Sequence, residues 1–262
     1  MEIFLQVDTW VALLTLTFLE IVLGIDNIIF ISISANKLPE DKRRKATLIG
    51  LSLAMITRVA LLFSVSYLVA LKDPIFTIDT SWLKAGVSIQ SIILFLGGLF
   101  LLYKSTKEIR EKVEESHQME EVKVEKNSTF SNVIFQIILI DIVFSFDSIL
   151  TAVGMTNGIE GALTIMVIAV VISMIIMMGF ANPVNKFVSK NPTIQMLALS
   201  FLILIGFMLI AEGAHLSNTI IFNNSVGSIP KGYLYFAIAF SLGVEFLNMR
   251  IVRNNKKKSS KK

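Results

Sequence analysis

The sequence contains no cysteine, which excludes a disulfide framework, a thiol nucleophile and a thiolate metal site. It has only two histidines, His117 and His215, and no nucleophile motif lies near either, which disfavours a Ser-His-Asp hydrolase. The glycines form neither a G-x-G-x-x-G nor a G-x-x-x-x-G-K-S/T pattern, so no loop is shaped to hold nucleotide phosphates. We therefore expect neither an enzyme nor an ATP-driven pump, and no cofactor.

Charged residues are also scarce, at 17% of the chain, whereas 54% is hydrophobic and the mean hydropathy is +0.71. Apolar runs of about 18 residues or more recur, which is typical of a polytopic membrane protein rather than a soluble core. These runs and their short connections use up the 262 residues, so we expect one membrane domain in a lipid bilayer. The net charge of +4 lies mainly in connections and the tail, where membrane orientation accounts for it, so we expect no nucleic-acid partner.

Seven apolar segments of about 17 to 25 residues are each long enough to span a bilayer as a helix. They lie near 10–34, 47–70, 86–103, 132–153, 161–180, 193–211 and 233–249. The breaks between them carry turn-forming pairs such as Asn182-Pro183. The first segment follows no basic leader and contains Glu20 and Asp26, so we expect it to remain as a helix rather than to be cleaved.

Lysine and arginine predict how the chain is oriented. Of the 24 basic residues, 20 fall in one set of alternating connections and in the tail, and the other set holds only Lys72, Lys84 and Lys231. By the positive-inside rule the first set is cytoplasmic. The N-terminus is then expected outside and the C-terminus in the cytoplasm.

The longest connection, 104–129, mixes six basic with seven acidic residues in a composition that favours helix. We expect a solvated helical extension of the third segment into the cytoplasm. This charged loop is also the one candidate surface for protein partners. The lysine-rich tail, 250–262, is expected to be disordered and held near anionic headgroups.

A ten-residue motif occurs twice, as EIVLGIDNII at 20–29 and as DIVFSFDSIL at 141–150. Each copy lies in an apolar segment and carries two acids six residues apart. A carboxylate at the bilayer centre costs about 2.5 to 3.5 kcal/mol, so four of them indicate a functional site.

The spacing of the two copies predicts the architecture. They fall in the first and fourth segments, so the repeating unit is three helices, and an odd number inserts the second unit upside down. We therefore expect an all-α membrane protein with an inverted three-plus-three repeat, a layout common among secondary transporters that bind substrate near the midplane. Its parts are repeat one at about 8–103, repeat two at about 130–212, and a seventh helix at about 232–249.

The four acids suggest a path for a cation. Six residues along a regular helix separate Glu20 from Asp26 by about 9 Å and about 120°, so one ion reaches both only if the helix opens, for example at Gly24. The inverted repeat instead predicts two stacked pairs, Glu20 with Asp147 nearer the outside and Asp26 with Asp141 nearer the cytosol.

Neighbouring polar side chains complete the candidate site. The amide oxygen of Asn27 and the hydroxyl of Ser148 would join the carboxylates in an all-oxygen set, which suits hard cations such as Mg²⁺, Ca²⁺ and Mn²⁺. Arg58 falls in the middle of the second segment and needs a partner, which we expect to be one of the four acids or Glu245. It either fixes the helices together or neutralises the site when metal is absent. Glu212 is a candidate for the outer exit.

Residues 15–30 and 136–150, with the doubled acid motif, resemble the paired signature of the TerC family of integral membrane proteins, named for tellurite resistance. The apolar segments fit that family across nearly the whole chain. The resemblance implies a seven-helix protein of the bacterial plasma membrane that moves divalent metal, chiefly Mn²⁺, out of the cytosol. The choice of Mn²⁺ over Mg²⁺ rests on this resemblance alone.

Three functions remain open on the sequence. The first is a secondary transporter that exports a divalent cation, with the proton gradient as a candidate drive, because clustered acids bind both metal and protons. The second is a membrane scaffold that delivers metal to partner proteins or organises them, without transport. The third is a carrier of amino acids or organic cations, which would need an open, partly aromatic pocket between the repeats. The oligomeric state is not predicted.

Overall fold

The computed structural model describes residues 2–64, 73–117, 129–156 and 158–259. Within these ranges it describes all side chains except those of residues 2, 3, 25, 26, 115–117, 147 and 252–259. The backbones of Asp26 and Asp147 are therefore described as helical, whereas their side chains lie outside the described residues.

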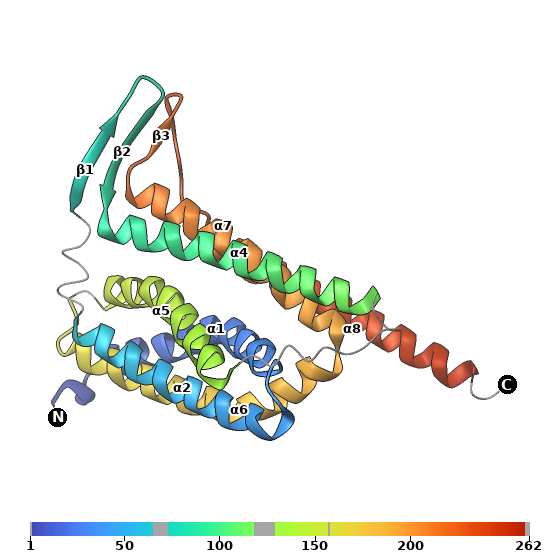
Figure 1. The fold of residues 1–262 in the computed structure, drawn as a ribbon. Helices are drawn as coiled ribbons and strands as arrows, with labels where there is room; N and C mark the ends of the chain where they lie inside the picture. The colour runs from blue at the N-terminus through green and yellow to red at the C-terminus, as the bar shows by residue number, and fades with distance from the viewer. Residues whose placement is uncertain (1, 65–72, 118–128, 157, 260–262) are drawn as a thin grey trace.

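The described ranges contain seven helices long and apolar enough to cross a membrane, as the sequence predicts (Figure 1). A short 3-10 helix, η1 (Glu2–Leu5), precedes them. The helices are α1 (Val7–Ala35), α2 (Glu40–Phe63), α4 (Ile89–His117), α5 (Phe130–Met155), α6 (Ala162–Lys190), α7 (Pro192–Leu216) and α8 (Lys231–Ser259).

Three helices run well past the apolar segments that predict them. Helix α8 continues to Ser259, so the disorder expected for the tail is wrong over residues 250–259. Helix α4 continues through the charged residues to His117, which is the helical extension that their composition favours. Helix α6 continues to Lys190, so the break expected at Asn182-Pro183 is wrong. Pro183 cannot donate the usual hydrogen bond to the carbonyl of Gly179, but Val188 beyond it stays buried, and this packing keeps the helix going.

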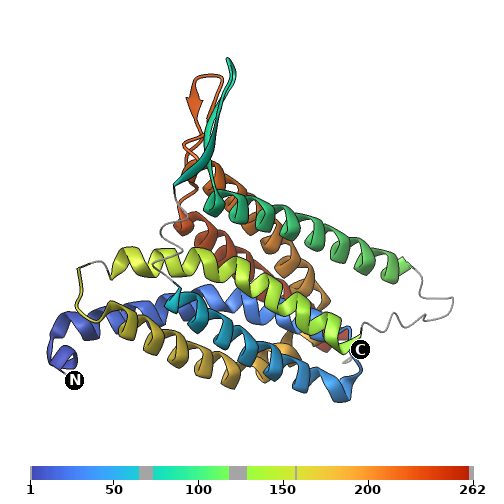
Figure 2. The same cartoon turned by 60° about the vertical axis from the view of Figure 1, so that its left-hand side comes forward.

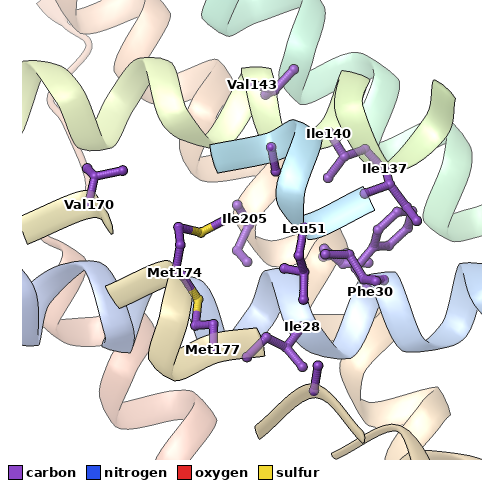
Figure 3. Packing of buried hydrophobic residues seen from close by; sticks show 14 of the residues in the cluster. Ile28, Phe30, Leu51, Ile137, Ile140, Val143, Val170, Met174, Met177 and Ile205 are labelled. Carbon is purple, nitrogen blue, oxygen red and sulfur yellow. The ribbon is translucent and has the colours of Figure 1, made fainter. Parts of the chain in front are cut away.

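Four helices form the centre of the bundle, and two others lie beside it as a pair. Helix α1 packs along α6 and α2 packs against α5, while α4 packs along α7 (Figures 1 and 2). The buried core of the central helices is mainly aliphatic and includes the ring of Phe30, and Met174 and Met177 fill the space beside α1 (Figure 3). Helix α8 contacts mainly α7 and is otherwise largely exposed along its apolar length.

Two glycines set the closest approach of α4 and α7. A Cβ atom on Gly98 would lie 2.5 Å from the carbonyl oxygen of Gly206, and one on Gly206 would lie 3.0 Å from that of Gly98. There is no room for a side chain, so the two backbones touch at this level. Small residues that permit such contact are typical of helix pairs in membranes. Gly213 likewise lies against the carbonyl of Ser91, so the two helices run antiparallel.

A small antiparallel sheet, which the sequence reading did not predict, closes one end of the molecule. Its strands are β1 (Pro74–Asp79), β2 (Leu83–Ser88), β3 (Ile220–Ile221) and β4 (Asn224–Ser225), paired in that order. The first hairpin joins α2 to α4 and the second joins α7 to α8, and Lys84 pairs with Ile220 where they meet. Phe222 and Asn223 both have positive φ, as the tight turn between β3 and β4 requires.

We call this the sheet end, and the far end of the helices the opposite end. Helix α1 starts at the sheet end, and α8 runs from there to the C-terminus at the opposite end (Figure 1).

The glycine contact gives a test of the packing. Gly98→Ala places a methyl group against the backbone of α7, and overpacking of this kind costs about 1 to 3 kcal/mol. We expect a lower thermal unfolding midpoint in detergent. Gly179→Ala in α6 is the matched control, because a Cβ there meets nothing within 4 Å. A Gly98→Ala protein as stable as the control would contradict the contact.

Candidate functional site

The two copies of the repeated motif lie in the middle of α1 and of α5, and both helices are continuous through them. The opening expected at Gly24 is therefore not found. A Cβ on Gly24 would collide with the thioether sulfur of Met177 on α6, so this glycine makes room for a neighbouring side chain instead of breaking the helix. Ser145, at the position of Gly24 in the second copy, donates a hydrogen bond of 3.2 Å to Asp141.

Arg58 on α2 lies between acids from both motifs. Its Nη1 donates to Glu20 Oε2 on α1 at 2.6 Å. Its Nη2 donates to Asp141 Oδ1 on α5 at 2.8 Å, and its Nε donates to the same carboxylate at 3.1 Å and 3.3 Å. Only 2% of Arg58 and 3% of each acid is exposed, so the three charged groups are removed from solvent together. This ion triad joins three helices at the level of the motifs.

Asn27 adds an amide group beside the triad. Its Nδ2 donates to Asp141 Oδ1 at 3.3 Å, which places the amide directly beside the triad. Its Oδ1 is buried and has no hydrogen-bond partner among the described residues. A buried acceptor left unpaired costs about 1 to 3 kcal/mol and calls for an explanation. A cation held beside Asp141 would provide one.

The described side chains include only one member of each expected pair of acids. Asp26 and Asp147 lie outside the described side chains, so the pairs Asp26 with Asp141 and Glu20 with Asp147 stay a prediction. What the structure brings together is Glu20 and Asp141, through Arg58. We expected Arg58 to pair with one of the four acids or with Glu245. The two partners that the structure describes both belong to the four acids.

The triad is unbalanced in charge. Counted as ionised groups, two carboxylates and one guanidinium sum to one negative charge. A buried net charge is costly, so a further cation beside the triad would be stabilised. The arrangement is therefore suited chemically to exchange cations.

A cavity of about 60 Å³ extends from Arg58 toward the sheet end. Ser148 lines it beside Arg58, and Glu212 at the end of α7 lines it together with Lys231 at the start of α8. Its volume is enough for several water molecules. Ser148 and Glu212 are thus in one cavity, as the expected path for a cation requires, whereas His215 faces the carbonyl of Val226 in the loop between α7 and α8.

A second ion cluster, not expected from the sequence, lies at the opposite end. Glu108 of α4 is buried between Lys37 and Lys104, at 2.6 Å and 2.8 Å, and Lys37 also pairs with Glu111 at 3.1 Å. Burial lowers the pKa of Lys37, but the hydrogen bonds and charges of Glu108 and Glu111 outweigh it and leave this pKa raised. The four-residue spacing of Lys104 and Glu108 was the one signal in the sequence. The cluster holds the α1–α2 connection against α4.

The triad gives a sharp stability test. Arg58→Gln leaves two buried acids without their partner, and breaking a buried ion pair this way costs about 3 to 5 kcal/mol. The triple variant Arg58→Gln, Glu20→Gln, Asp141→Asn removes all three charges and should recover much of that free energy of unfolding. Chemical unfolding in detergent micelles measures both. A triple variant as unstable as Arg58→Gln would show that charge burial is not the cause.

The chain matches the family described as "Integral membrane protein TerC family" over residues 5–260. No solved structure matches it significantly.

Curated relatives cover nearly the whole chain. It is 45% identical over 249 residues to the UPF0053 inner membrane protein YgdQ of Escherichia coli strain K12, which covers 95% of each protein. It is 43% identical over 247 residues to a UPF0053 protein of Haemophilus influenzae, covering 94% of this chain and 95% of the relative. It is also 43% identical over 255 residues to the UPF0053 inner membrane protein YoaE of E. coli K12. That match covers 97% of this chain and 45% of YoaE, so more than half of YoaE lies outside it.

Proposed function

The chain belongs to the TerC family of integral membrane proteins, and from this premise we propose that it exports a divalent cation, Mn²⁺ first among them, across the bacterial inner membrane. The observation that carries the proposal is the buried group around Asp141. Two acids from the two motifs, one guanidinium and the oxygen of Asn27, which has no partner among the described side chains, meet there within the seven described helices that can span a membrane.

The proposed ligands are the oxygen atoms of the two motifs. They are Glu20, Asp26, Asn27, Asp141, Asp147 and Ser148, with Glu212 at the exit. Carboxylate, amide and hydroxyl oxygens suit hard dications, and no histidine or cysteine lies in the motifs to favour zinc or copper. The preference for Mn²⁺ over Mg²⁺ comes from the family resemblance and not from this ligand set.

We propose that Arg58 is the counter-ion of the site when no metal is bound. In the absence of metal its guanidinium supplies the positive charge that Glu20 and Asp141 need. A dication carries two charges and would balance both carboxylates, so its arrival removes the need for Arg58 between them. Exchange of the metal for protons at the acids of the two motifs would couple metal movement to a proton gradient.

The helix pairing supports the inverted repeat that the proposal uses. If α1, α2 and α4 correspond to α5, α6 and α7, then the pair α1–α6 corresponds to the pair α2–α5, and both pairs are in contact. Gly98 and Gly206 occupy corresponding places in the repeats and meet each other, as positions on a twofold axis do. An axis in the membrane plane with the binding site near it is the arrangement of many secondary transporters.

The charge distribution orients the proposed path. The connections at the opposite end hold most of the basic residues, so that end is proposed as cytoplasmic and the sheet end as extracytoplasmic. Metal would then enter beside the motifs and leave through the cavity of Glu212.

The absence of cysteine makes this orientation simple to test. Ser81→Cys at the tip of the first hairpin should react with a membrane-impermeant maleimide in intact cells, because Ser81 is exposed at the sheet end. Lys107→Cys, also exposed but on the charged part of α4, should react only after permeabilisation. The opposite labelling pattern would reverse the proposed direction of transport.

The transport proposal is tested by variants that keep side-chain size and remove charge. Asp26→Asn, Asp147→Asn, Glu20→Gln and Asp141→Asn should each abolish manganese tolerance, because an amide cannot offset the dehydration of a dication. Growth in Mn²⁺ and cellular manganese content are measured at matched amounts of inserted protein. Glu40→Gln, an exposed acid at the start of α2, is the control. Full protection by all four variants would favour the scaffold function instead.

Asn27→Leu is a sharper variant, because both ion pairs of Arg58 stay in place. It removes the amide, both its oxygen and the Nδ2 that donates to Asp141, and losing a polar group beside a metal site lowers affinity by about 10-fold or more. We expect the KM for Mn²⁺ in everted vesicles to rise by at least about this factor, with little change in the unfolding midpoint. An unchanged KM would remove Asn27 from the ligand set.

A further inference from the structure

The cavity beside the ion triad is lined by two cationic side chains. Arg58 lies at its inner end and Lys231 at the sheet end, about where the proposed path leaves the protein. The triad accounts for Arg58. Lys231 is one of only three basic residues expected on the outer side, and it belongs neither to the triad nor to the proposed ligands.

Lys231 is held in the cavity by a specific contact. Its Nζ donates a hydrogen bond of 3.0 Å to the hydroxyl of Thr151 on α5, and the pair is partly buried. Thr151 lies three residues after Ser148 and four after Asp147 along α5, so all three belong to one face of that helix. The ammonium group of α8 thus reaches the same face of α5 that carries the second motif.

Lys231 makes the two ends of the proposed repeat differ in charge. It is the first residue of α8, the helix outside the proposed three-plus-three repeat. The two halves of an inverted repeat alone would present similar sites toward both faces. A cation added at one end by an extra helix makes that end less attractive to a second cation than the other.

Resting on the proposed function, we propose that Lys231 is a tethered cation at the release end of the path. Its ammonium competes with the metal ion for the oxygen atoms of the cavity, including Ser148 and Glu212, and so keeps the affinity for metal low on the outer face. A built-in repulsive group of this kind is a general means of discriminating between bound states. An exporter needs weak affinity where it releases its cargo, because tight binding there would slow release and invite rebinding.

The proposal is tested by product inhibition in everted vesicles, whose lumen corresponds to the outside of the cell. Export of Mn²⁺ is measured as uptake, with increasing Mn²⁺ already in the lumen. Lys231→Met should lower the lumenal concentration that halves export by about 10-fold, while the KM for Mn²⁺ on the cytoplasmic face stays within about twofold. Lys231→Arg retains the charge and should behave like the parent.

A second variant covers the case in which Lys231→Met does not insert. Thr151→Val keeps the lysine and removes the hydroxyl that holds it, so it should shift the same inhibition constant in the same direction by a smaller factor.

Normal inhibition constants in the variants that insert, with the parent exporting, would overturn the role of Lys231 and leave the proposed function standing. Parent vesicles that take up no Mn²⁺ would overturn the proposed function, and the inference with it.

Discussion

The buried guanidinium of Arg58 fixes how three of the central helices face one another. Arg58 cannot lie in the middle of a membrane helix without partners, and its fork geometry allows it to hold one acid at two points and a second acid at another. Glu20 and Asp141 therefore fix the positions of α1 and α5 relative to α2. The aliphatic packing of the central helices fills the space around this contact, but it does not by itself specify which faces of α1 and α5 turn toward each other.

Hydropathy predicts the seven spans because their length and composition alone make them membrane helices. The pairing of Arg58 with acids of the motifs is also predictable, since the cost of a bare charge in the bilayer leaves few partners. The contact between Asn27 and Asp141 could not be predicted, because adjacent residues differ by about 100° around a helix and α1 is apolar on several sides. The contact with Asn27 comes from the packing of α1 against α5.

The predictions that were wrong or missing concern places where tertiary contacts outweigh local preference. Pro183 marks a break by composition, yet α6 runs through it because its last turns remain packed. The second hairpin was missed because β3 and β4 have two residues each, and β3 gains its pairing from β2, a strand far away in the sequence, while β4 pairs with β3. Phe222 gives no turn signal at all, since a positive φ is unusual for an aromatic residue.

The charge of the site links its stability to its proposed use. A site that was neutral and fully hydrogen-bonded would hold the helices together but would have no reason to take up a cation. The triad has two acids and one guanidinium, and the Oδ1 of Asn27 beside it has no hydrogen-bond partner within the described part of the chain, so further positive charge would be stabilised there. Arg58 bonds to both acids but carries a single positive charge. The same imbalance that costs stability is therefore what a transported dication would relieve.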